Sequence, residues 1–287
     1  MRIASNKIKD IIQFAYQELD SIYEKQEIRT MIHTIIEHFT DFNLMKILSQ
    51  KDELRVSESE LLKINFAIKD LKKEKPLQQI IGYTDFLDIR IEVNEHVLIP
   101  RVETEEIVQR IIRENKNKNP KRIADLCSGS GCISIALKKA FPQSEVYAYE
   151  ISEEAIKKSI ENAEKNKEKI NFFKENILKS TEKNQEFDII VSNPPYVREC
   201  EKTLMRNNVL LYEPSLALFV SDEDPLIFYK HILEFCNRNL AKNGCVYMEI
   251  NEFLGKETEL LFKNKGYKTI VYKDFKDKDR LVFAKKD

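Results

Sequence analysis

The chain has 287 residues, of which 42% are hydrophobic and 33% are charged. Such a length and composition predict a globular protein with one large domain and one smaller domain. Because 47 basic residues are balanced by 48 acidic ones, a protein that mainly binds duplex nucleic acid is disfavoured, since such proteins usually have a net basic surface.

Neither a disulfide framework nor a metal site is indicated. The five cysteines are odd in number and include no Cys-x-x-Cys pair, and the four histidines lack metal-ligand spacing. The first residues, MRIASNKIKDII, do not resemble a signal peptide, because charges are scattered among their apolar residues. No apolar run approaches the ~18 residues of a membrane span. We therefore expect a cytoplasmic protein with no metal.

Residues 1–75 are predicted to form a small helical domain. They contain no Gly or Pro, and apolar residues recur at helical spacing over 8–15 and over 32–39. Ser57 precedes Glu60 in a capping-box pattern, ahead of another apolar run.

Residues 76–101 change character. Pro76 ends the helical domain, and Gly82 and Asp88 punctuate short runs in which apolar and polar residues alternate. This pattern predicts a β-hairpin linker over 77–100. A helix is expected to follow over 102–115.

From residue 121 onward, strand and helix patterns alternate, which predicts an open parallel α/β sheet. Strands are expected at 122–126, 146–150, 170–173, 187–192 and 245–250, with helices from near 131 and over 153–167, 225–240 and 253–265. Two further strands, 267–272 and 280–284, are separated only by 273–279. That connection is too short for a parallel crossover, so these strands must pair antiparallel. Class I methyltransferases end in this way, and nicotinamide-type dinucleotide folds normally do not.

The first strand of this sheet runs into the sequence DLCSGSGC, residues 125–132. Gly129 and Gly131 allow a ligand to approach the backbone and to meet free N–H groups at a helix start. Ser134 occupies the position of the third glycine of a dinucleotide fingerprint. Glu150 closes the next strand and can accept hydrogen bonds from both hydroxyls of a ribose. The pattern indicates a nucleoside site, either for NAD or for S-adenosylmethionine, and the missing glycine and the antiparallel ending favour S-adenosylmethionine. The alternative is a plain tight turn and an exposed glutamate.

Asn176 and Ile177 follow the third strand, where an adenine ring would lie. The asparagine could bond the exocyclic amine and the isoleucine could cover a ring face. The alternative interpretation of Asn176 is an ordinary turn residue.

The fourth strand ends in the tetrapeptide Asn193, Pro194, Pro195 and Tyr196. In open α/β sheets the ligand lies beyond the carboxyl ends of the strands, which places this tetrapeptide beside the cofactor. An amide nitrogen is a poor nucleophile, and two fixed acceptors, the Asn193 side-chain oxygen and the Pro194 carbonyl, can orient it. The prolines restrict the backbone that holds both oxygens. Tyr196 can stack on a planar amide. The alternative is a strand end with a turn.

These motifs closely resemble the release factor glutamine methyltransferase family, also called HemK or PrmC. The resemblance covers nearly the whole chain. Its matching segments are KPLQQIIGYTDFLDIRIEVNEHVLIPRVETE at 75–105, DLCSGSGC at 125–132, the acid Glu150, SNPPY at 192–196, YEPSLAL at 212–218 and DRLVFAK at 279–285.

The resemblance implies a helical substrate-recognition domain at 1–75, a β-hairpin linker at 76–101 and a class I S-adenosylmethionine-dependent methyltransferase domain at 102–287, with a seven-stranded sheet whose last strand is antiparallel. It implies methylation of the N5 atom of the glutamine in the Gly-Gly-Gln motif of class I release factors. Separately, we expect a monomer that binds neither membrane nor nucleic acid. By position, the cofactor contacts would be Cys127, Ser128, Gly129, Ser130, Gly131, Glu150, Asn176, Ile177 and Asn193, and the glutamine would be held and its reaction catalysed by the tetrapeptide 193–196. Arg101 and Glu103 would lie near the cofactor.

Some residues depart from the family pattern: Val102 replaces a proline, Glu150 replaces the usual aspartate, residues 221–226 lack the glycines of a Gly-Asp-Gly-Leu-like turn, and Asn251 replaces a glycine. We expect these departures to alter loop geometry without touching the tetrapeptide.

Three rival functions are methylation of a glutamine in ribosomal protein L3, methylation of adenine N6 in nucleic acid, and nucleoside-dependent regulation without catalysis. The PRVETE segment favours release factors over L3, the neutral charge disfavours nucleic acid, and the intact tetrapeptide disfavours a non-catalytic regulator.

Overall fold

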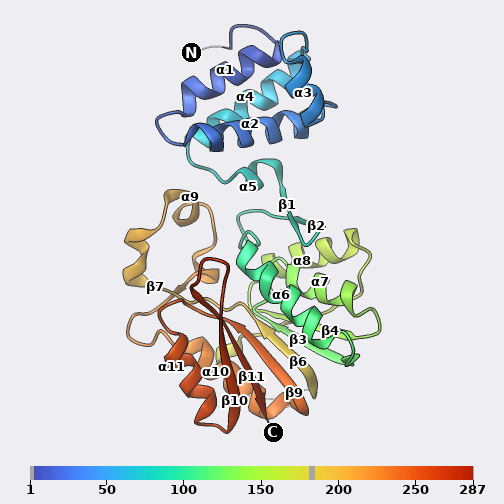
Figure 1. Ribbon diagram of the computed structural model, residues 1–287, viewed down its shortest axis with the longest axis vertical. Coiled ribbons are helices and arrows are strands. Elements are labelled where there is room, and N and C mark those ends of the chain that lie inside the picture. Colours follow the sequence, from blue (N-terminus) through green and yellow to red (C-terminus); the bar gives the residue numbers. More distant parts are fainter. Residues whose placement is uncertain (1–2, 181–184, 287) are drawn as a thin grey trace. The chain divides into compact units, whose positions relative to one another are not determined.

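The computed structural model describes residues 3–180 and 185–286, which form two compact units (Figure 1). The first, here called the helical unit, contains the described residues up to Gly82 together with Arg206–Tyr212. The second, here called the sheet unit, contains Tyr83–Met205 and the described residues from Glu213 onward.

The helical unit packs amphipathic helices around one apolar core. Its helices are α1 (Ile8–Leu19), α2 (Lys25–Phe39), α3 (Leu44–Gln50), α4 (Glu58–Lys72), α5 (Leu77–Ile81) and α9 (Asn207–Leu210). Ile11, Ile32 and Ile64 are fully buried in its core, as expected for apolar residues at a helical repeat. The predicted capping box is confirmed, because Ser57 and Glu60 bond reciprocally at the start of α4.

The hairpin predicted over 77–100 is correct for 83–92 and wrong for the residues on either side. Residues 77–81 form the short helix α5, for which Pro76 is the N-cap, and Gly82 ends it with φ of 85°. The hairpin pairs β1 (Tyr83–Phe86) with β2 (Ile89–Glu92). Its two turn residues both have positive φ, the geometry that favours tight hairpins.

The segment Arg206–Tyr212 belongs to the helical unit, although it is far in sequence from the other residues of that unit. The Tyr212 hydroxyl donates to the Lys73 carbonyl at 2.8 Å, and Gln79 donates to the Tyr212 carbonyl at 2.8 Å. Asn207 donates to the Glu74 carboxylate at 2.7 Å. The chain therefore leaves the sheet unit after Met205 and re-enters it at Glu213.

The sheet unit contains a seven-stranded sheet with the order β10-β11-β9-β6-β3-β4-β5. Its strands are β3 (Arg122–Leu126), β4 (Glu145–Glu150), β5 (Asn171–Lys174), β6 (Phe187–Ser192), β9 (Leu240–Glu249), β10 (Tyr267–Lys273) and β11 (Asp279–Lys286). The pairs among β3, β4, β5, β6 and β9 are parallel, whereas β11 is antiparallel to both β9 and β10. The antiparallel pairing expected at the end of the chain is thus confirmed.

Helices cover both faces of this sheet, and each face has its own apolar core. One face packs against α6 (Val102–Asn115), α7 (Cys132–Ala140), α8 (Glu153–Lys165) and the hairpin, and the other face packs against α10 (Ile227–Asn239) and α11 (Gly255–Lys263). Because the central strands are parallel, their carboxyl ends meet at one edge of the sheet. Among the described residues, no helix is long and apolar enough to cross a membrane.

Candidate active site

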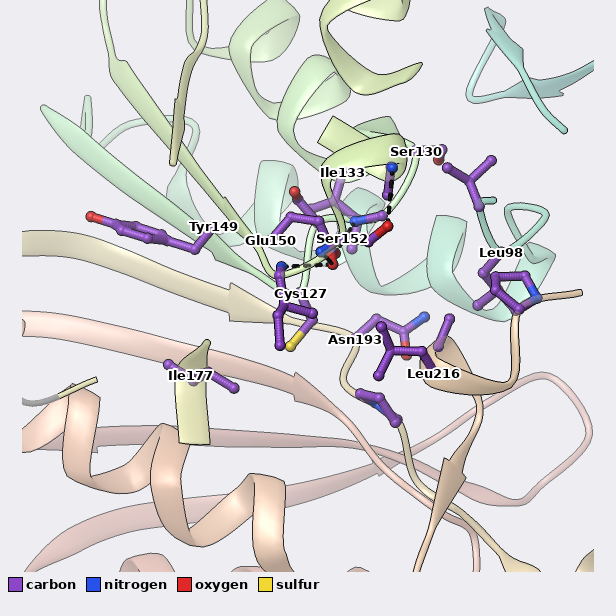
Figure 2. A pocket seen from close by; sticks show the side chains of 18 of the residues that line it. Leu98, Cys127, Ser130, Ile133, Tyr149, Glu150, Ser152, Ile177, Asn193 and Leu216 are labelled. Atoms are coloured by element: carbon purple, nitrogen blue, oxygen red, sulfur yellow. Dashed lines mark hydrogen bonds between the residues drawn. The ribbon is translucent and has the colours of Figure 1, made fainter. Parts of the chain in front are cut away.

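A cavity of about 300 Å³ opens at the carboxyl ends of β3, β4 and β6, a size within reach of a small organic ligand. Figure 2 shows the side chains of Cys127, Glu150 and Asn193 gathered around it. The structure brings together these expected site residues in its wall: Cys127, Ser128, Gly129, Ser130, Glu150, Asn176, Ile177, Asn193 and Pro195. Gly131, Pro194 and Tyr196 do not line the cavity.

The glycine-rich turn has three residues with left-handed backbone conformations. Cys127, Gly129 and Gly131 have φ of 62°, 53° and 79°, in the left-handed region that favours glycine. A Cβ atom on Gly131 would also lie 3.0 Å from the Cβ of Ser159 on α8. Gly131 therefore serves the site indirectly, because it lets α8 pack against the turn at the start of α7.

Glu150 is held against that turn by backbone donors. Its Oε2 atom accepts from the N–H of Gly129 at 3.0 Å, and its Oε1 atom accepts from Ile151 and Ser152 at 2.8 and 2.9 Å. The side chain is buried, so the interpretation as an exposed glutamate is wrong. With about two acceptor positions per carboxylate oxygen, Oε2 retains one for a ligand hydroxyl.

The residues after β5 combine a turn role with a place in the cavity. Asn176 is the N-cap of the 3-10 helix Ile177–Lys179, and its side-chain oxygen accepts from the N–H of Leu178 at 3.0 Å. Ile177 is buried and presents an apolar side chain to the cavity. Both residues therefore line the same cavity as the glycine-rich turn.

Two buried oxygens in this region have no hydrogen-bond partner among the described residues: Ser128 Oγ, in the cavity wall, and Asp125 Oδ1. The other oxygen of Asp125 accepts from the N–H and hydroxyl of Ser134 at 3.1 and 2.5 Å. Burial raises the pKa of Asp125 to about 7. Unsatisfied buried polar atoms are costly in a folded protein. The Ser128 hydroxyl, which is in the cavity wall, therefore fits a ligand that has a polar portion.

The tetrapeptide is anchored by contacts at both ends. Asn193 lines the cavity, and the Tyr196 hydroxyl donates to Oε1 of buried Glu249 at 2.9 Å. The carbonyl of Tyr196 accepts from the side chain of Asn251 at 3.1 Å. The expectation that Asn251 would not touch the tetrapeptide is therefore wrong, because the amide that replaces the family's usual glycine is long enough to reach this carbonyl.

Sequence reasoning missed Glu249 and Thr104, which join the two ends of the tetrapeptide. The Thr104 hydroxyl donates to Oε2 of Glu249 at 2.7 Å, and the Asn193 side-chain amide donates to the Thr104 hydroxyl oxygen at 3.2 Å. Thr104 and Glu249 are both buried. Burial raises the pKa of Glu249, against the opposing effects of these hydrogen bonds and of the Arg280 charge. A carboxylate that ends an apolar strand, as Glu249 does, was the available sequence signal.

Glu213 is a second acid that sequence reasoning left without a role. It is buried and accepts from the N–H of Ile99 at 3.0 Å and from the Arg101 guanidinium at 2.5 Å. These bonds fix the segment before α6, in which Arg101 lines the cavity. Glu103 instead pairs with Lys276 at 2.7 Å and is absent from the cavity wall, so the expectation that it lies beside the cofactor is not met.

A short parallel pair of strands closes the loop that follows the tetrapeptide. β7 (Val197–Arg198) pairs with β8 (Phe219–Val220), and the N–H of Val197 donates to the carbonyl of Leu218 at 2.9 Å. The pairing brings Leu216 back to the cavity wall. The loop between these strands therefore begins and ends at the site.

Comparisons with known proteins agree with this fold and site. The family described as "Methyltransferase small domain" matches residues 104–218. A release factor glutamine methyltransferase of Flavobacterium psychrophilum is 45% identical over 93% of this chain and 94% of its own length. One of Bacteroides thetaiotaomicron is 37% identical over 96% and 98%.

Solved structures show the same fold at low sequence identity. A methyltransferase from Pyrococcus furiosus has a TM-score of 0.52 at 18% identity, covering 80% of this chain and 99% of that one. A ribosomal protein L11 methylase from Lactobacillus delbrueckii has a TM-score of 0.51 at 20% identity, covering 69% and 86%. The sheet unit thus has the class I methyltransferase fold that the sequence predicted.

Proposed function

Because the chain belongs to the release factor glutamine methyltransferase family, we propose that it transfers a methyl group from S-adenosylmethionine to the side-chain amide nitrogen, N5, of the glutamine in the Gly-Gly-Gln motif of class I peptide chain release factors. One observation carries this proposal: Asn193 of the tetrapeptide lines the same cavity as Glu150 and the glycine-rich turn. A substrate amide bound at Asn193 therefore meets the methyl donor in a single space.

The residues of the cavity suit S-adenosylmethionine. Glu150 Oε2 has an acceptor position for a ribose hydroxyl, Ile177 offers an apolar surface for the adenine, and the unpartnered Ser128 hydroxyl suits the amino-acid portion. When bound, S-adenosylmethionine supplies a methyl group on a positively charged sulfur, which leaves as a neutral thioether without needing an acid.

The role of the chain's own groups is to make a poor nucleophile reactive. The Asn193 side-chain oxygen, in the cavity wall, accepts one N–H of the glutamine amide and helps to direct the nitrogen lone pair toward the methyl donor. The Pro194 carbonyl is the second acceptor expected from sequence, but Pro194 does not line the cavity. With S-adenosylmethionine bound, this nitrogen would take the methyl group from the sulfur, which would leave as the thioether, and the surplus proton on nitrogen would pass to solvent. Holding both reactants in place lowers the entropic part of the barrier.

The test is incubation of the full chain with radiolabelled S-adenosylmethionine and separate candidate substrates. We expect a class I release factor to be labelled, and peptide mass spectrometry to locate one methyl group on the glutamine of Gly-Gly-Gln. A release factor with that glutamine changed to alanine is the matched control. Equal labelling of this control, or preferential labelling of ribosomal protein L3 or of duplex DNA, would contradict the proposal.

We propose that the helical unit recognises the release factor outside its Gly-Gly-Gln motif. Support comes from its separate core and from the absence of its α1 to α4 from the cavity wall. The same assay tests this role with a chain that lacks residues 1–82 and has 206–212 replaced by a Gly-Ser linker of equal length. It should bind S-adenosylmethionine normally and methylate intact release factor at least about tenfold less efficiently, a difference of ~1.4 kcal/mol. Unchanged efficiency would contradict the role.

Glu150→Ala is expected to weaken S-adenosylmethionine binding by ~1–3 kcal/mol, because a hydrogen bond to a buried charged acceptor is lost. The variant also leaves the Gly129 N–H without its partner. Isothermal titration calorimetry measures the effect. Glu153→Ala is the matched control, since Glu153 is an exposed glutamate in the first turn of α8. If the two variants bound equally well, Glu150 would have no part in the cofactor site.

A further inference from the structure

Glu249, Thr104 and Asn193 form a hydrogen-bonded chain that the fold itself brings together. β6 and β9 are parallel neighbours, and Ser192 is in register with Met248. Asn193 and Glu249 therefore emerge side by side at the same edge of the sheet. The first turn of α6 places the Thr104 hydroxyl between them, 2.7 Å from Glu249 Oε2 and 3.2 Å from Asn193 Nδ2.

The direction of these hydrogen bonds is set by Glu249. An ionised carboxylate only accepts, and a hydroxyl has one proton to donate. Because the Thr104 proton is directed to Glu249, only lone pairs of its oxygen remain for Asn193. Asn193 must then turn its NH₂ group toward Thr104. Its oxygen is left on the other side of the planar carboxamide, and no donor from the described residues bonds to it.

Burial raises the pKa of Glu249, and its three polar neighbours oppose that rise. Each of its oxygens already receives a hydroxyl proton, from Thr104 and from Tyr196. Arg280 lies close enough for its positive charge to favour the ionised carboxylate, and it is itself fixed by Asp274 at 3.0 Å. Hydrogen bonds in such a buried network strengthen one another when every member is satisfied.

We propose that Glu249 and Thr104 are positioning residues for methyl transfer: they fix the carboxamide of Asn193 with its oxygen toward the substrate and its nitrogen away from it. The inference rests on the proposed function, which gives the Asn193 oxygen its role as acceptor for the glutamine amide. The opposite orientation would present an NH₂ group to the substrate N–H, and two donors cannot bond each other.

The same carboxylate also controls the far end of the tetrapeptide, through the Tyr196 hydroxyl. Glu249 therefore holds Tyr196 directly and Asn193 through Thr104. This arrangement gives the buried acidic group a positioning role that a hydrophobic residue of similar size, although free of the desolvation cost, could not have.

The kinetic test compares Thr104→Val, which removes the hydroxyl at nearly constant volume, with Thr104→Ser, which keeps it. We expect Thr104→Val to lower kcat for release factor methylation about 10–100-fold, as residues that orient a reacting group often do, with KM and S-adenosylmethionine affinity changed less than about twofold. Thr104→Ser should retain most of the activity. In an Asn193→Ala background, Thr104→Val should cost nothing further. The proposal would be overturned if Thr104→Val lowered kcat by the same factor in the Asn193→Ala background. It would also be overturned if Thr104→Val alone kept the kcat of the unmodified chain.

Neutron diffraction provides a readout that needs no activity, because it distinguishes an NH₂ group from an oxygen. We expect the NH₂ group of Asn193 to face Thr104 in the unmodified chain, and to lose this fixed orientation in Thr104→Val and in Glu249→Gln. If the side-chain oxygen of Asn193 faces Thr104 in the unmodified chain, the positioning role of Thr104 and Glu249 is overturned, even if the enzyme methylates glutamine. Conversely, if the NH₂ group of Asn193 faces Thr104 but the chain labels no release factor, the proposed function is contradicted and the positioning role is not.

Discussion

Asn193→Ala is expected to lower kcat for release factor methylation about 10²–10³-fold, the usual cost of removing one preorganised electrostatic contact from a reacting group. The variant removes the oxygen that orients the substrate amide, whereas Glu150 and the glycine-rich turn remain to bind S-adenosylmethionine. Cofactor affinity should therefore fall far less than kcat. Single-turnover methylation and calorimetry measure the two quantities separately.

Two further variants sharpen this test. Asn193→Asp keeps an acceptor of similar size but cannot donate to Thr104, and it adds a charge beside the sulfonium, so we expect it to be nearly as impaired as Asn193→Ala. Asn166→Ala is the matched control, because Asn166 follows α8 and does not line the cavity. Full activity in Asn193→Ala would require the amide-orienting mechanism to be abandoned.

Tyr196→Ala is expected to lower kcat about 10²-fold, because it removes both the ring that ends the tetrapeptide and the proton donated to Glu249. Tyr196→Phe keeps the ring and should lower kcat less than about tenfold, at a cost in stability of ~1–3 kcal/mol for the lost hydrogen bond to a buried carboxylate. Equal activity of the alanine and phenylalanine variants would show that the ring has no role.

The stability cost of Tyr196→Phe should depend on pH in a definite direction. Burial raises the pKa of Glu249, and the Tyr196 hydroxyl is one of the groups that oppose this rise. A carboxyl whose pKa is raised by folding contributes less stability as the pH increases above its unfolded value, about 4.3. Losing the hydroxyl raises the folded pKa further. The gap in free energy of unfolding between wild type and variant should therefore stay constant at low pH and widen only once the pH rises past the folded pKa of Glu249 in the wild type. Denaturant titrations at several pH values measure it; a gap that narrows would contradict the argument.

Local sequence patterns predicted much of the fold. In the site, they predicted the glycine-rich turn and the tetrapeptide. The bounds predicted from the sequence for the strands β3 and β6 and for the helix α6 agree with the observed bounds. The glycine-rich turn and the tetrapeptide were recognisable because each motif is contiguous in sequence. Their meeting in one cavity follows from the parallel sheet, whose strands end at a common edge.

The residues that were missed depend on contacts between distant segments. Thr104 and Glu249 lie 145 positions apart in sequence, and neither has a local pattern that predicts its partner. Glu213 acts on the segment before α6 in the same way, through pairing across 114 positions. The helix α5 was mistaken for part of a hairpin because five residues are too few to display a helical repeat.

The return of Arg206–Tyr212 to the helical unit has a consequence for engineering. The chain passes between the two units at three places, after Gly82, after Met205 and after Tyr212. The helical unit is therefore not formed by one continuous N-terminal segment. Grafting the first 82 residues of a relative onto this chain would leave Tyr212 and Asn207 facing foreign partners in place of Lys73 and Glu74. A chimera that exchanges the whole helical unit must therefore transplant two pieces of sequence together, and the second piece lies inside the loop between β7 and β8.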